Sequence, residues 1–144
     1  MAKSGKQKKS ISKQTDPVVH FEMPVEDRKR TAKFYEKAFN WKTEKLGKAN
    51  GNYMIAYTSE TGKKGRPKEK GSINGGFYPK SQNKPAQYPS VVISVKDIKA
   101  SMKKIERAGG KIIGEPVEIP GMGIYVSFFD TEDNRVSIME PYVK

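Results

Sequence analysis

Residues 25–38, VEDRKRTAKFYEKA, return 70 positions later as residues 95–108, VKDIKASMKKIERA. Six of the fourteen aligned positions are identical, and the Val-x-Asp start and the final Ala are the matches least expected from a Lys-rich composition. In both copies a short apolar stretch, 18–23 or 91–95, runs into an Asp, which is a favoured N-cap for a following helix. The chain therefore contains one strand–helix unit twice.

The two predicted helices cover about residues 28–39 and 98–108. Apolar residues recur at helical spacing on one face of each, and Gly109-Gly110 ends the second helix as a left-handed C-cap would. The predicted core-facing residues are Ala32, Tyr35 and Phe39 in the first helix and Ile98, Met102, Ile105 and Ala108 in the second. We place Phe39 and the nearby Trp41 in the core rather than against a cofactor.

Three strand-like stretches follow each helix, separated by Gly, Pro and Asn turns. They are residues 41–46, 53–58 and 72–78 in the first half and 111–119, 124–129 and 135–140 in the second. The predicted fold class is α+β, with tandem βαβββ modules over about residues 17–80 and 88–142 of a single domain, 16–144. Residues 1–15 hold five Lys and no acid, so we predict a basic disordered tail.

This organisation resembles the vicinal oxygen chelate superfamily, which includes glyoxalase I, extradiol dioxygenases and bleomycin-resistance proteins. The motifs that carry the resemblance are VHFEMPVED at residues 19–27, FYEKAFNW at 34–41 and FDTEDN at 129–134, and it extends over about residues 17–142. It implies a cup-shaped mixed sheet with the helices on the outside. It also implies a homodimer and, in catalytic members, one divalent metal held by the first and fourth strands of each module.

Composition excludes several kinds of chemistry. The chain has 28 Lys+Arg against 16 Asp+Glu, a net charge of +12, no Cys and one His. Disulfides, thiolate metal sites, cysteine nucleophiles and sites that need two imidazoles from one chain are therefore excluded. No run of 18 apolar residues predicts a membrane span, and the N-terminus lacks the apolar stretch of a secretory signal, so we expect a cytoplasmic protein without a membrane partner.

Strand alternation tests the metal-binding positions. Val18, His20 and Glu22 should face the cup, and Val19, Phe21 and Met23 the helices. The 70-residue offset carries His20 onto Ser90, and aligning the last strands of the modules carries Ser137 onto Gly75. Only His20 among these four positions is a good ligand for zinc, nickel, iron or manganese. Glu140 lies three positions from Ser137 and should point to the other face, so it does not add a second ligand. With one good ligand, we expect no metal cofactor.

The binding candidates share the predicted cup-facing rows. They are His20, Glu22, Ser90, Val92, Tyr125, Ser137 and Met139. The row with Tyr125 and Ser127 is preferred for the cup over the row with Ile124 and Val126, because it carries the hydroxyls. His20 is also the catalytic candidate, as a hydrogen-bonding group or a general base, and it is equally compatible with a purely structural role.

We therefore expect a glyoxalase- or bleomycin-resistance-like protein that binds a small, partly apolar molecule in the cup without a metal. One alternative is a metal-dependent lyase or dioxygenase of the glyoxalase type with an atypical ligand shell; whether the chain is an enzyme stays open. The other is a non-enzymatic scaffold whose basic tail and basic run 62–70 meet an anionic partner. Neither run contains stacking aromatics, so nucleic acid is not an expected partner.

Overall fold

The computed structural model describes residues 14–142, and most of the predicted basic tail lies outside these residues. Eight strands form one mixed sheet in the order β2-β3-β4-β1-β5-β8-β7-β6. The first module contributes β1 (Val18–Val25), α2 (Arg28–Phe39), β2 (Lys42–Lys45), β3 (Met54–Tyr57) and β4 (Asn74–Pro79). The second contributes β5 (Ser90–Ser94), α3 (Ile98–Arg107), β6 (Lys111–Ile119), β7 (Gly123–Phe129) and β8 (Arg135–Pro141).

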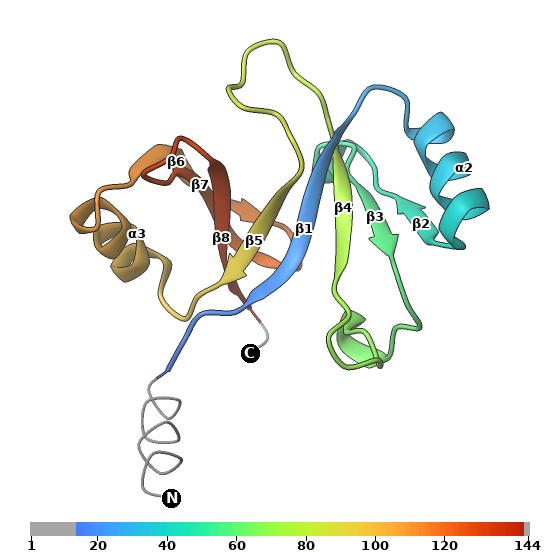
Figure 1. The fold of residues 1–144 in the computed structure, drawn as a ribbon, viewed down its shortest axis with the longest axis horizontal. Coiled ribbons are helices and arrows are strands. Elements are labelled where there is room, and N and C mark those ends of the chain that lie inside the picture. Colours follow the sequence, from blue (N-terminus) through green and yellow to red (C-terminus); the bar gives the residue numbers. More distant parts are fainter. Residues whose placement is uncertain (1–13, 143–144) are drawn as a thin grey trace, which may run out of the picture.

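The two modules join through their first strands. β1 pairs antiparallel with β5, and each of these strands pairs in parallel with the last strand of its own module, β4 or β8. Figure 1 shows β1 and β5 side by side in the middle, with one helix on the outer side of each half. The predicted α+β fold with two βαβββ units is thus confirmed. The sheet face turned away from the helices is called the inner face below.

Both helices begin as the repeat predicts. The Asp27 carboxylate accepts a hydrogen bond from the Arg30 backbone N–H at 2.9 Å, and Asp97 accepts one from the Ala100 N–H at 3.1 Å. Each Asp satisfies a backbone donor that the first helical turn leaves without a partner. After α3 the chain leaves the helix through Gly109, whose φ of +102° favours glycine.

Each module has its own hydrophobic core beneath its helix. In the first module Val25, Met54, Ala56 and Phe77 are buried, and in the second Val95, Ile98, Val126, Phe128 and Ile138 are. Trp41 packs on the first cluster, with its ring 4.7 Å from that of Tyr35. The prediction that Phe39 is a core residue is wrong, because it is the last residue of α2 and 61% of it is exposed. Asn40 turns the chain there in a left-handed conformation, which leaves the Phe39 ring at the edge of the core.

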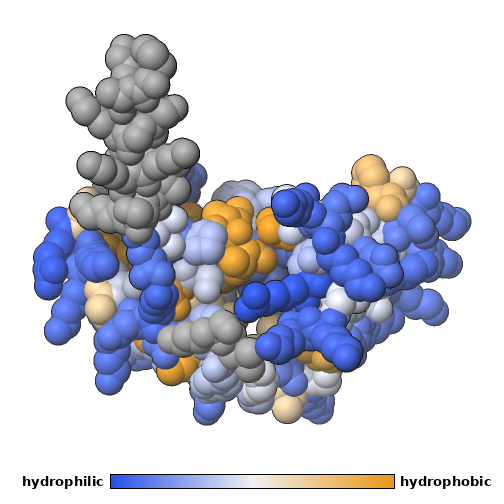
Figure 2. Space-filling model, turned by 90° about the horizontal axis from the view of Figure 1, so that it is seen from below, coloured by the Kyte–Doolittle hydropathy of each residue, from blue (hydrophilic) through white to orange (hydrophobic). Residues whose placement is uncertain are grey.

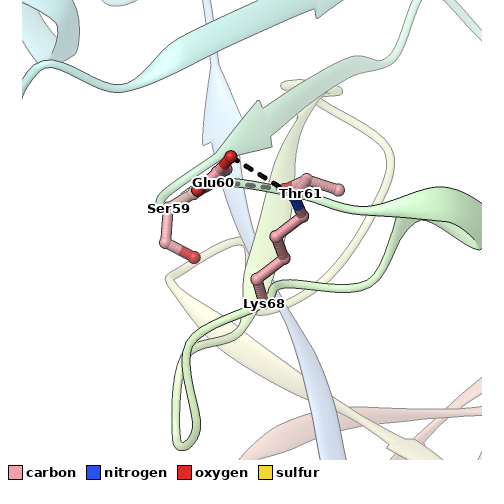
Figure 3. A network of polar contacts seen from close by, with 4 residues as sticks. All are labelled: Ser59, Glu60, Thr61 and Lys68. Carbon is pink, nitrogen blue, oxygen red and sulfur yellow. Dashed lines mark hydrogen bonds and ion pairs between the residues drawn. The ribbon is translucent and has the colours of Figure 1, made fainter.

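The basic run at residues 62–70 lies in the connection between β3 and β4, part of which is η2 (Lys63–Gly65). Figure 3 shows the Lys68 ammonium beside the Glu60 carboxylate, 3.3 Å apart, and the Thr61 hydroxyl donating to the Ser59 carbonyl. A second short helix, η1 (Lys48–Asn50), connects β2 and β3. Within residues 14–142 neither α2 nor α3, of 12 and 10 residues, has the length and apolar character to cross a membrane.

Candidate functional site

The inner face carries the polar side chains of the two central strands. Phe21 and Met23 of β1 pack in the core under α2, and Ile138 of β8 packs under α3. Because successive side chains of a strand point to opposite faces, His20, Glu22 and Ser137 lie on the inner face. Hydrogen bonds through Tyr53 and Tyr125 connect these three side chains, which agrees with their lying on one face.

Glu22 is the centre of a buried hydrogen-bond network. The Tyr125 hydroxyl donates to Glu22 Oε1 at 2.6 Å, and the Tyr53 hydroxyl donates to Oε2 at 3.4 Å. His20 Nε2 lies 2.8 Å from the same Tyr53 oxygen. Every contact is satisfied when His20 donates its Nε2 proton to Tyr53 and Tyr53 donates its own to Glu22.

The network continues into the second module through hydroxyl groups. The Ser137 hydroxyl lies 2.7 Å from that of Tyr125 and 2.8 Å from that of Ser127, and Ser137 is 1% exposed. Arg135 Nη2 donates to the Ser127 oxygen at 3.3 Å. A continuous set of polar contacts therefore runs from His20 to Arg135 across both modules.

Burial sets the protonation states of this network. It lowers the pKa of His20 from 6.5 to about 4, so the imidazole is neutral at neutral pH. It raises the pKa of Glu22, while the hydrogen bond from Tyr125 and the positive charge of Arg135 act in the opposite direction. Burial and the nearby Glu22 carboxylate also raise the pKa of both Tyr53 and Tyr125, which remain protonated donors.

The other predicted site residues line the same face. Ser90 lies opposite Glu22 across the β1–β5 pair, and Val92 lies between His20 and Ser137. Met139 pairs with Tyr125 and is half-buried, whereas Val92 is 2% exposed. Val18, expected to face the cup, precedes an irregularity in the β1–β5 pairing and is 45% exposed.

The structure corrects one position by a single residue. Gly76 lies opposite Glu22, whereas Gly75 lies opposite Phe21 on the helix side. The inner-face counterpart of Ser137 is therefore Gly76, and the assignment of Gly75 is wrong. A Cβ atom on Gly76 would lie 2.1 Å from the Tyr53 ring, so the missing side chain makes room for that ring.

The sequence prediction did not include Tyr53, Tyr78 and Arg135, which lie on the inner face. Strand alternation contains a signal for each of them. Tyr53 shares the parity of Ile55, opposite the buried Met54 and Ala56; Tyr78 shares that of Gly76; and Arg135 shares that of Ser137.

Known proteins share this architecture. The family model of the Glyoxalase/Bleomycin resistance protein/Dioxygenase superfamily matches residues 18–138. The chain belongs to this superfamily. A glyoxylase-like domain-containing protein of Didymella fabae is 30% identical over 124 residues, which cover 81% of this chain and 88% of the relative.

Solved structures share the fold at low sequence identity. A hypothetical protein of Bacillus halodurans C-125 has a TM-score of 0.64 at 16% identity, over 91% of this chain and 98% of its own. A methylmalonyl-CoA epimerase variant of Streptomyces coelicolor has a TM-score of 0.65 at 12% identity, over 90% of this chain and 97% of its own. These likenesses establish the fold of a superfamily member.

The residues present do not fit the divalent metal of the catalytic superfamily members. The four corresponding positions are His20, Gly76, Ser90 and Ser137, and a transition metal needs about three good protein ligands. Across residues 14–142 no three His, Asp or Glu side chains gather closely enough to hold a metal ion. Glu140, the acid of β8, accepts a hydrogen bond from the Ile98 backbone at the start of α3.

Proposed function

We propose that this superfamily member binds a small, partly apolar molecule on the inner face, without a transition metal. The observation that carries the proposal is the buried network that joins His20, Glu22 and Tyr125 across the two modules. Hydrogen-bonding groups gathered in this way on one face of a sheet are typical of binding sites, where a few polar groups orient a ligand.

The chemistry of the face supports a ligand with both polar and apolar parts. Tyr53 and Tyr125 stay protonated and donate to Glu22, whose carboxylate is an acceptor that a ligand hydroxyl can share. Met139, which is half-buried, supplies apolar surface beside them. Figure 2, which shows the molecule from below the view of Figure 1, has a group of hydrophobic residues near its middle, with hydrophilic residues around them.

The test combines elemental analysis with a thermal-shift screen of small neutral and anionic aromatic compounds. We expect no stoichiometric zinc, nickel, iron or manganese, and we expect ligands whose stabilisation is lost in Tyr125→Phe. Tyr57→Phe is the matched control, because the Tyr57 hydroxyl bonds Glu44 at the exposed edge of the sheet. Close to one metal per chain, lost on His20→Ala, or equal binding by the Tyr125 and control variants, would overturn the proposal.

A second candidate is metal-independent proton transfer on the bound molecule. It is favoured by Glu22, a buried carboxyl group whose pKa is raised by burial, because catalytic acids and bases are often carboxyl groups perturbed in this way. The readout is solvent deuterium incorporation into a bound compound, followed by NMR. Exchange that is abolished by Glu22→Gln supports this candidate, and exchange that persists in that variant contradicts it.

A cytoplasmic homodimer is part of the proposal and follows from the superfamily resemblance. Light scattering coupled to size-exclusion chromatography tests the oligomeric state directly. A mass of one chain at micromolar concentration contradicts the dimer.

A further inference from the structure

Arg135 occupies one end of the inner face. On β8 it comes before Ser137 and Met139 in the row of side chains that face inward. Val92 lies opposite Ser137 in the parallel β5–β8 pair, so Arg135, two residues earlier, lies beside Ser90. Tyr78 of the first module is its neighbour from the other side. The guanidinium group therefore lies at the junction of the two modules, at the end of the network that begins at His20.

Among the residues that the structure describes, neutral groups hold the Arg135 side chain. Nη2 donates to the Ser127 hydroxyl at 3.3 Å, Nη1 donates to the Tyr78 hydroxyl at 3.4 Å, and the guanidinium carbon lies 5.5 Å from the centre of the Tyr78 ring. Stacking on an aromatic face fixes the plane of the guanidinium group.

No carboxylate of residues 14–142 pairs with Arg135. The ion pairs in that range join Arg30 to Asp27 and Lys68 to Glu60. Glu22 is close enough to feel the charge of Arg135, but it receives its hydrogen bonds from two tyrosines. A half-buried guanidinium group with five donors and two weak neutral partners has donors left for a planar anion.

A pocket of about 390 Å³ opens beside this group, where β5 and β8 begin. Its volume lies within the range of small-molecule sites, about 300–1,000 Å³. Its walls are Ala86, Tyr88, Pro89, Ser90, Val91, Asp130, Asp133, Asn134, Arg135 and Val136. Apolar and aromatic side chains thus lie next to the guanidinium group and the Ser90 hydroxyl.

Two acids, Asp130 and Asp133, also line this pocket, so the Arg135 end is the part of it that favours an anion. The Asp130 carboxylate is directed into its own turn, where it accepts from the backbone N–H groups of Glu132 and Asn134 and from the Asn134 side chain. Asp133 follows in the same turn with a φ of +63°. On the other side Lys84 and Arg135 both act on Glu22, so the inner face at this end carries two nearby cations.

We propose that Arg135, with Ser90 and Tyr78, forms an anion subsite, and that the ligand of the inner face is a small carboxylate with an apolar body. This inference rests on the proposed function and narrows the class of ligand. The carboxylate lies against the guanidinium fork, and the apolar body lies against Tyr88 and Pro89 of the pocket wall.

Phenylacetate and its neutral isostere phenylacetamide test the subsite in NMR titrations of the full chain. We expect phenylacetate to bind at least about tenfold more tightly, which corresponds to about 1.4 kcal/mol. Arg135→Gln should abolish this preference, Arg135→Lys should keep part of it, and Arg107→Gln on the exposed surface of α3 should leave it unchanged. Thermal melts of the variants show that each remains folded.

Three results overturn the subsite: equal affinities for the two compounds, a carboxylate preference that survives in Arg135→Gln, or no binding of either compound up to about 20 mM. The two proposals fail in different ways. If both compounds bind equally and their binding depends on Tyr125, the inner-face site is supported and the anion subsite is contradicted. A carboxylate preference that depends on Arg135 but not on Tyr125 retains the subsite and removes the proposed role of the network.

Discussion

Lowering the pH from 8 to 5 should destabilise the fold through His20. Its folded pKa is about 4, below the value of about 6.5 in an unfolded chain, so the unfolded state takes up a proton first as the pH falls. Stability is therefore fully present above pH 6.5 and is lost as the pH falls toward 4. At pH 5 this difference in proton binding corresponds to about 2 kcal/mol of unfolding free energy.

The assay is urea unfolding at pH 8 and pH 5. Glu22 titrates in the opposite sense, because its folded pKa is raised and burial of its charge costs stability as the pH rises. The comparison is therefore made between Glu22→Gln and the double variant Glu22→Gln/His20→Asn. The first should lose about 2 kcal/mol more than the second between the two pH values. The same loss in both variants would refute the reasoning that His20 is held neutral by burial.

Four further predictions concern single positions. Gly76→Ala should cost about 1–3 kcal/mol in urea unfolding because its Cβ would meet the Tyr53 ring, whereas Gly47→Ala, with nothing within 4 Å, should have little effect; similar losses would contradict the close contact. Asp97→Ala should cost about 1 kcal/mol as the N-cap of α3, with Asn restoring most of it in the same assay. Met54→Ala should cost about 2–5 kcal/mol, since Met54 is fully buried, and a loss under 1 kcal/mol would show that the core rearranges. Glu22→Gln should raise the melting temperature at pH 8 more than at pH 4, and a uniform change would contradict the cost assigned to burial of the charge.

The repeat and its alternation predicted the architecture and the inward direction of His20 and Ser137. They failed at Gly75 because β4 reads NGGFYP, and two adjacent glycines give no apolar alternation that marks a face. A one-residue shift there exchanges the two sides of the strand. Phe39 was misplaced for a different reason, because helical spacing identifies a face but not the point where the core ends.

The residues missed in the site share a physical reason. Tyr53 lies just before β3, and the sequence does not show whether the alternation of the strand extends to that residue. Tyr78 and Arg135 lie on opposite modules, 57 positions apart, and their contact depends on the pairing of β1 with β5. Pairing across modules is a tertiary property that periodicity within one strand cannot supply.

The room left by Gly76 makes the two halves of the duplication chemically unequal. One half keeps a carboxyl group and an imidazole, and an aromatic ring fills the space where its last strand has no side chain. The other half supplies hydroxyl groups from Tyr125, Ser127 and Ser137. An assembly of two identical first halves would lack those hydroxyl donors, and two second halves would have no acid to receive them. The present arrangement thus depends on two halves that differ in sequence.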